Sequence, residues 1–145
     1  MMNLGKNTKI WNIEKSYIAD DLITGDNCKI ASMVHIDRDV IIGNNVNIQG
    51  LVYIPPKTRI GNNVFIAPQV GFSNDSHPPN ELEGVTVCDD VMIFFGSKII
   101  GGVTIGRNSI VGMGSIVTKS IPENQVWFGN PARYRYDTIE YLKRI

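Results

Sequence analysis

His77 is the residue of this chain best suited to proton-transfer chemistry. It is one of two histidines, and it stands directly before Pro78 in the stretch GFSNDSHPPNELEG, residues 71–84. An imidazole titrates close enough to neutral pH to take a proton from a nucleophile. The nearby carboxylate of Asp75 has the chemistry to orient the ring or to stabilise its charged form. We therefore predict that His77 is a general base, against the alternative of a solvated loop histidine without a role.

Asn74 and Asp75, just before His77, allow two interpretations. Asn-Asp is common in turns, because both side chains hydrogen-bond to nearby backbone and tolerate left-handed conformations. The same polar groups are suited to holding a substrate in place. The sequence leaves both interpretations open.

The second histidine and the two cysteines have weaker claims to chemistry. His35 ends the hexad IASMVH and is predicted to be a rung-corner or interface side chain. Cys28 and Cys88 are too few for a disulfide framework. Each falls within a repeat and is predicted to serve packing or a turn.

Composition describes one ordinary globular domain rather than a special class. The chain has 145 residues, of which 43% are apolar and 19% charged. Fourteen basic residues balance fourteen acidic ones, which argues against nucleic acid or an anionic membrane as partner. No apolar run approaches a membrane span, and the start MMNLGKNTKIW lacks the apolar core of a signal peptide. We expect a reduced, cytoplasmic protein.

A repeat of six residues positions all of these side chains. Large apolar residues recur at this interval at Ile30, Ile36, Ile42, Ile48, Ile54, Ile60, Ile66 and Phe72, and again at Val87, Ile93, Ile99, Ile105, Val111 and Val117. Four residues after most of them comes a smaller or branched side chain, such as Val34 or Val40. No α-helix has this period, whereas short β segments joined by tight turns do.

The turn residues agree with this interpretation. GNNV recurs at 43–46 and 61–64, and GRNS stands at 106–109. Glycine and asparagine tolerate positive φ at little cost. Stacked rungs would bury a continuous column of isoleucine and valine while each rung pairs its backbone with the next. The sequence therefore predicts a single all-β domain, a parallel β-helix over residues 18–122.

Both ends of the repeat are predicted to be caps that protect the solenoid from further strand pairing. Residues 1–17 form the N-terminal cap, and the side chains predicted to close the first coil are Trp11, Ile13 and Tyr17. DTIE at 137–140 is typical of a capping box, with Asp137 as N-cap and Glu140 reaching back. A short C-terminal helix is expected over residues 134–145.

The repeat breaks only around His77. Phe72 and Val87 are fifteen residues apart, which is two and a half hexads. Pro78-Pro79 and the polar run after them predict a loop over about 74–86, outside the rungs. Loops on a rigid scaffold often carry binding and catalytic residues, so this loop is the candidate site.

The chain resembles the left-handed β-helix acyltransferases over roughly residues 18–133. His-Pro at 77–78, followed by a loop and a coil ending in GGVTIG (101–106), is similar to the galactoside, maltose and serine acetyltransferases. In those families this histidine is the general base. FSND (72–75) is similar to the FTND motif of the nucleotide-sugar 3-N-acetyltransferases, which acetylate an amino group on a UDP- or dTDP-linked hexose. That likeness places Asn74, with Asp75, in the substrate region.

The resemblance also implies a cofactor site and an assembly. VTKSIPENQVWFGNPAR (117–133) is shared across the superfamily, and its Lys119 and Arg133 match positions that face the phosphates or adenine end of coenzyme A. Ordinary surface charge is the alternative. A backbone N–H near Gly96 or Ser97 is expected to stabilise the oxyanion, and Gly114 is also assigned to the acetyl-CoA site. With three hexads per coil, sixteen hexads give about five coils in each chain. The resemblance also implies a homotrimer whose active sites lie between subunits.

Two departures from the family pattern stand out. Phe94 and Phe95 replace small residues near the expected path of the pantetheine arm, and Pro79 stands where the 3-N-acetyltransferases often carry arginine. The function expected is acetyl-CoA-dependent N-acetylation of a nucleotide-linked amino sugar, and the first alternative is a galactoside- or maltose-type sugar O-acetyltransferase. A γ-type carbonic anhydrase would need three metal-binding histidines, and this chain has two. A non-catalytic scaffold would bind no coenzyme A.

Overall fold

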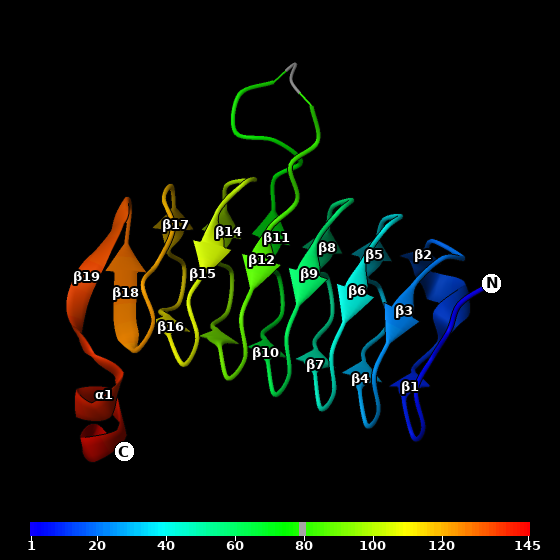
Figure 1. Cartoon of the computed structure of the whole chain (residues 1–145), viewed down its shortest axis with the longest axis horizontal. Helices are drawn as coiled ribbons and strands as arrows, with labels where there is room; N and C mark the ends of the chain where they lie inside the picture. Colours follow the sequence, from blue (N-terminus) through cyan, green and yellow to red (C-terminus); the bar gives the residue numbers. More distant parts are fainter. Residues whose placement is uncertain (79–80) are drawn as a thin grey trace.

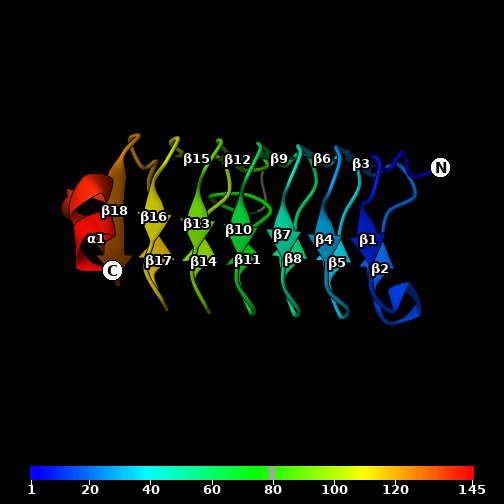
Figure 2. The same cartoon turned by 90° about the horizontal axis from the view of Figure 1, so that it is seen from below.

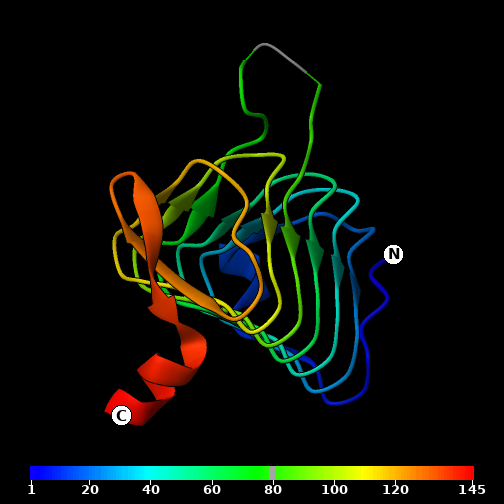
Figure 3. The ribbon, with the colours of Figure 1, turned by 60° about the vertical axis from the view of Figure 1, so that its left-hand side comes forward.

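The computed structural model describes residues 1–78 and 81–145, which wind into a parallel β-solenoid of three-sided coils (Figures 1 and 3). Each coil contributes one short strand to each of three sheets, except that the last coil adds only an isolated bridge, Ile121 to Ile105, to the third sheet. The six-stranded sheet holds β2 (Tyr17–Ile18), β5 (His35–Ile36), β8 (Tyr53–Ile54), β11 (Gly71–Phe72), β14 (Lys98–Ile99) and β17 (Ile116–Val117). The five-stranded sheet holds β3 (Ile23–Thr24), β6 (Ile41–Ile42), β9 (Arg59–Ile60), β12 (Thr86–Val87) and β15 (Thr104–Ile105).

The eight-stranded sheet runs the full length of the solenoid (Figure 2). Its strands are β1 (Lys9–Ile10), β4 (Lys29–Ile30), β7 (Asn47–Ile48), β10 (Phe65–Ile66), β13 (Met92–Ile93), β16 (Ile110–Val111), β18 (Gln125–Gly129) and β19 (Ala132–Asp137). The final pair, β18 and β19, is antiparallel. A 3-10 turn, η1 (Ile13–Lys15), precedes β2, and one helix, α1 (Thr138–Arg144), ends the chain.

The hexad residues form the core, as predicted. In most strands the second residue points inward and is buried, from Ile30 through Val117. The companion positions pack beside them, with Val34, Val40 and Val46 among the buried side chains. The predicted all-β parallel β-helix is therefore confirmed.

The solenoid has six coils rather than the predicted five. The additional coil comes from the N-terminus, where β1 pairs in parallel with β4 and Asn3 forms a bridge with Ile23. Residues 1–17 therefore extend the sheets instead of forming a separate cap. The residues predicted to close the first coil, Trp11, Ile13 and Tyr17, are 39%, 44% and 57% exposed. That prediction was wrong, because Met2, Ile10 and Ile18 pack against this end of the core instead.

Asparagine and aspartate side chains link one coil to the next at the GNN turns. The Oδ1 atoms of Asn44 and Asn62 accept the backbone N–H of Asp26 and Asn44 in the preceding coil, each at 2.8 Å. A glycine precedes each of these asparagines because the asparagine or aspartate side chain of the next coil occupies the space that a Cβ atom would need. A Cβ built on Gly43 would lie 2.5 Å from Oδ1 of Asn62 and 2.7 Å from the carbonyl oxygen of Gly61. The glycine and asparagine of the motif are thus complementary parts of one contact.

We expect Gly43→Ala to lower the free energy of unfolding by about 1–3 kcal/mol, because the added methyl group collides with backbone and must displace it. Gly71→Ala is the matched control, since a Cβ there meets only the Lys98 side chain, at 3.7 Å. Urea unfolding of both variants measures the difference. Equal stability of the two would show that the coils adjust to the methyl group without cost.

The inserted loop lies where the sequence predicted it. It connects β11 to β12 and projects away from the solenoid (Figure 1). It lengthens its coil by nine residues: β10 pairs with β13 at Phe65 and Met92, a step of 92 − 65 = 27, whereas Asn47 and Phe65 are 65 − 47 = 18 apart. Pro79, which the sequence comparison singled out, lies outside the described residues.

The C-terminal prediction was partly wrong. The chain continues beyond residue 122 into β18, and residues 134–137 belong to β19 rather than to the helix, because Tyr134 pairs with Trp127 in the antiparallel hairpin. Asp137 is the N-cap of α1 by position, but its side chain makes no capping hydrogen bond. It accepts one from the Tyr134 hydroxyl at 3.0 Å instead. Within residues 1–78 and 81–145, no helix has the length and hydropathy that crossing a membrane requires.

Candidate functional site

A groove of about 420 Å³ crosses the outer face of the six-stranded sheet over β11, β14 and β17. Its lining residues are Gly71, Phe72, Ser73, Lys98, Ile99, Ile100, Ile116, Val117 and Thr118. The groove exists because Gly71 presents no side chain between its sheet neighbours Tyr53 and Lys98. The lining is mostly aliphatic, with the Lys98 ammonium donating to the carbonyl oxygen of Gln69. Such a surface suits an extended apolar ligand.

The stem of the inserted loop begins at one end of this groove. The Ser73 hydroxyl accepts the N–H of Gly101 at 2.7 Å and donates to the carbonyl oxygen of Asp75 at 2.8 Å. A Cβ on Gly101 would lie 2.9 Å from the Cα of Asp75. The first glycine of GGVTIG thus has a structural purpose, since it lets the stem lie directly on the next coil.

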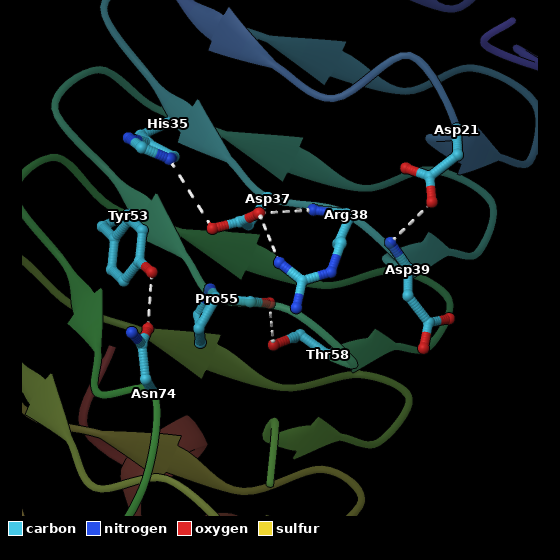
Figure 4. A network of polar contacts seen from close by, with 9 residues as sticks. All are labelled: Asp21, His35, Asp37, Arg38, Asp39, Tyr53, Pro55, Thr58 and Asn74. Carbon is cyan, nitrogen blue, oxygen red and sulfur yellow. Dashed lines mark hydrogen bonds and ion pairs between the residues drawn. The ribbon is translucent and has the colours of Figure 1, made fainter. Parts of the chain in front are cut away.

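Asn74 is held by a tyrosine of the preceding coil (Figure 4). The Tyr53 hydroxyl donates to Oδ1 of Asn74 at 2.5 Å. Partial burial raises the pKa of Tyr53 most, the charge of Asp37 raises it further, and the contact with Asn74 opposes both. The phenol therefore stays protonated at neutral pH and remains a donor. This fixes the amide oxygen of Asn74 and leaves its NH₂ group for other partners.

His35 lies in β5 rather than at a corner of the coil. Of the two predicted positions, rung corner or interface, the rung corner was therefore wrong. Its ring stands between those of Tyr17 and Tyr53, with centroid distances of 4.7 and 4.9 Å. Its Nε2 is 3.8 Å from Oδ2 of Asp37, and its side chain is 48% exposed (Figure 4). His35 is thus one rung of an outward-facing aromatic column on the six-stranded sheet.

His77 is exposed on the loop and is not among the residues that line the groove. Its Nδ1 is 3.1 Å from Oγ of Ser76. The partner of the ring is therefore Ser76, not the Asp75 carboxylate that the sequence suggested. Within one chain, the structure does not bring the predicted base to the groove.

The glycines predicted for the cofactor site form turns of successive coils. Gly96 and Gly114 have φ of +75° and +67°, and their N–H groups donate to the carbonyl oxygens of Pro68 and Phe95 at 3.0 and 2.8 Å. Ser97 is buried, and its hydroxyl donates to Gly112 at 2.9 Å. The N–H expected to stabilise an oxyanion at Gly96 is thus already engaged, because corner residues of stacked coils pair with each other.

Lys119 and Arg133 are both exposed, as phosphate contacts would have to be. Lys119 follows Thr118, the last residue of the groove lining. Arg133 lies on β19, and its Nη1 donates to the carbonyl oxygen of Ala132 at 2.8 Å. Phe94 packs toward Tyr141 of α1, at 6.4 Å between centroids, and Phe95 is exposed at 43%. Neither phenylalanine lines the groove.

Sequence reasoning missed the groove itself. The signal was the residue before each core position on one face, which reads Tyr17, His35, Tyr53, Gly71, Lys98 and Ile116 down the stack. A glycine in a column of large side chains predicts a recess. The described residues hold no group of three His, Cys, Asp or Glu side chains that could bind a metal ion.

The chain belongs to the hexapeptide-repeat family of bacterial transferases: the family description "Bacterial transferase hexapeptide (six repeats)" matches residues 39–74 and 84–119. The galactoside O-acetyltransferase of Escherichia coli is 40% identical over 77 residues, which are 47% of this chain and 38% of that protein. The chain spans two fifths or less of the length of the first curated relatives that it matches.

Two solved structures define the likeness in three dimensions. A galactoside acetyltransferase in complex with coenzyme A has a TM-score of 0.65 and 29% identity, covering 99% of this chain and 68% of that one. PerB from Caulobacter crescentus, in complex with CoA and GDP-perosamine, has a TM-score of 0.80 and 23% identity, covering 91% and 58%. The second likeness concerns the fold alone.

Proposed function

We propose that this protein is an acetyl-CoA-dependent acetyltransferase, and that its acceptor is the amino group of a nucleotide-linked sugar. The observation that carries the proposal is the apolar groove, which begins at the FSND stem and ends beside Lys119. A sugar hydroxyl is the second candidate acceptor. It is favoured by the 40% identity to a galactoside O-acetyltransferase over 77 residues.

The groove suits the pantetheine arm of the donor. Its floor crosses three strands, which span roughly 10 Å at the usual spacing of about 4.8 Å between paired strands. Aliphatic walls receive the methylene and gem-dimethyl groups of the arm. Lys98 lies in the wall, and Lys119 follows its last residue. The Lys119 ammonium at this end has the charge to hold the phosphates of coenzyme A.

Asn74 and Asp75 are proposed to hold the acceptor. Because Tyr53 fixes the amide oxygen of Asn74, the NH₂ group keeps one orientation in which it can donate to a sugar oxygen. His35 and Asp37 lie one coil further back, on the far side of Tyr53 from Asn74 (Figure 4). Donor and acceptor would thus occupy opposite sides of the loop stem.

In the proposed reaction, Nε2 of His77 takes the proton of the acceptor as its nitrogen or oxygen bonds to the acetyl carbonyl carbon. The tetrahedral intermediate then collapses, the carbon–sulfur bond breaks, and the departing thiolate receives that proton. The products are the acetylated acceptor and coenzyme A. Holding the two substrates together provides much of the acceleration.

A homotrimer would complete the site. His77 stands on a loop that projects away from its own solenoid (Figure 1), while the groove lies on the face of the six-stranded sheet. In a closed threefold assembly the loop of one subunit can reach the groove of the next. We therefore place each active site between subunits.

The test combines binding with the His77→Ala variant. Coenzyme A should raise the melting temperature of the protein, and a panel of UDP- and dTDP-amino sugars and simple galactosides should identify the acceptor class. With a hydroxyl acceptor, His77→Ala should lower kcat by about 100-fold or more, because general-base catalysis contributes at least that much. An amine acceptor should lose less, because a neutral amine is already nucleophilic.

Glu81→Gln, on the same loop, is the matched control and should keep wild-type activity. Unchanged activity of His77→Ala would overturn the base assignment. Absence of coenzyme A binding in calorimetry would overturn the enzyme proposal and favour a scaffold.

A further inference from the structure

We propose that Ser76 and Glu83 are positioning residues, which hold His77 in the tautomer that carries its proton on Nδ1 and leaves Nε2 free. This inference rests on the proposed role of His77 as base. It starts from a chain of three polar contacts at the loop stem. Ser76 contacts His77 at 3.1 Å on one side, and Glu83 accepts from both the backbone N–H and the hydroxyl of Ser76 on the other, at 3.0 and 3.3 Å.

Glu83 is held in place from two directions. Its backbone N–H donates to the carbonyl oxygen of Asn74 at 3.1 Å, which joins the two sides of the loop stem. Its carboxylate lies against Gly102, where a Cβ would stand 2.7 Å from Oε2. Gly102 adopts φ of +83° in a turn of the next coil. The carboxylate of Glu83 therefore packs against the solenoid, and the carbonyl oxygen of the next residue, Gly84, accepts the N–H of Gly102 at 2.7 Å.

The direction of the hydrogen bonds follows from the chemistry of the three groups. A carboxylate only accepts, so the single hydroxyl proton of Ser76 points to Glu83. The Ser76 oxygen then has only lone pairs to offer His77. The contact at Nδ1 is consequently an N–H donated by the ring. Because a neutral imidazole carries one N–H, Nε2 holds the lone pair that accepts a proton.

A purely structural role would make the same contacts, since Ser76 and Glu83 also close the loop. The two roles differ in one respect. A loop clasp needs the Ser76–Glu83 bonds but is indifferent to the ring tautomer, whereas a positioning chain determines it. The tautomer is therefore the readout that separates them.

Nitrogen-15 NMR of the imidazoles at pH 8, above the ordinary range of histidine titration, provides this readout. The chain has only two histidines, so His77→Gln assigns both sets of signals. The wild type should show Nδ1 protonated and Nε2 unprotonated at His77. Ser76→Ala should shift the ring toward the Nε2–H tautomer, and Ser76→Thr, which keeps the hydroxyl, should restore the wild-type pattern. Glu83→Gln should give a mixture, because an amide both donates and accepts.

In acetyl-transfer assays, Ser76→Ala should lower kcat about tenfold with little change in KM, and Ser76→Thr should recover it. The melting temperature of each variant checks that the fold is kept. An Nε2–H tautomer in the wild type, or an unchanged tautomer in Ser76→Ala, overturns the proposal. If the tautomers behave as expected but the wild-type protein transfers no acetyl group to any acceptor, the proposed function fails while the positioning chain is supported.

Discussion

Gly71→Phe should abolish coenzyme A binding and leave the solenoid intact. Gly71 is the floor of the groove, between Tyr53 and Lys98 in the sheet. A phenylalanine ring there occupies the space that the pantetheine arm would need. We expect the Kd for coenzyme A to rise at least about 100-fold, which corresponds to ~2.7 kcal/mol. Calorimetry with coenzyme A measures the loss directly.

The Gly71→Phe substitution should not lower the stability of the fold. The side chain at position 71 points outward, and a Cβ there has its nearest contacts with Lys98, from 3.7 Å, which is ordinary van der Waals distance. Glycine weakens a strand interior, whereas aromatic residues favour strands. The melting temperature of Gly71→Phe should therefore equal or exceed that of the wild type. A loss of binding with an unchanged melt separates a blocked groove from a damaged fold.

Gly71→Ala is the matched control, because one methyl group leaves most of the 420 Å³ open. It should bind coenzyme A within about threefold of the wild-type affinity, a difference of under 1 kcal/mol. Undiminished binding by Gly71→Phe would show that the donor binds elsewhere. The bare turns at Gly96 and Gly114, where a Cβ meets nothing within 4 Å, would then be the next place to test.

The fold was predictable because one physical rule repeats along the chain. Each two-residue strand buries one aliphatic side chain, so the spacing from Ile30 to Phe72 is sufficient to predict the sheets and the core. The N-terminal coil was less predictable, because β1 buries Ile10 only partly and its strand signal is a single pair. The sixth coil includes this two-residue strand, so the coil count from the sequence was one too low.

The candidate site was predictable only in part, because its contacts join residues that are far apart in the sequence and meet only when the coils stack. Tyr53 reaches Asn74, 21 residues away, and the stem contact from Gly101 to Ser73 spans 28. The loop changes the coil step from 18 residues to 27, so the plain hexad count does not give the partners of Ser73 or Gly96. His77 was singled out because it stands beside prolines at the break. Glu83 was not singled out because its contacts with Ser76 and Asn74 form only when the loop closes.

Mixed oligomers of two impaired variants should regain activity if the site is shared between subunits. His77→Ala keeps its groove but lacks the base, and Gly71→Phe keeps the base but blocks the groove. Gly71→Phe alone should show little acetyl transfer, and His77→Ala alone should show less than the wild type. After the two are unfolded together in equal amounts and refolded, half of the loops carry His77 and half of the grooves are open. Random assembly then gives both features at about a quarter of the inter-subunit sites.

Recovery near that fraction is expected only when the loop of one chain serves the groove of another. If each chain uses its own His77 and its own groove, no mixture of these variants contains an intact site. The double variant Gly71→Phe, His77→Ala mixed with Gly71→Phe is the control, because no groove in that mixture is open. If the activity of the refolded mixture only equals the sum of the activities of the two unmixed variants, the base and the groove belong to the same chain. The loop would then have to fold back toward β11 and β14, and the projecting arrangement in Figure 1 would not be the reactive one.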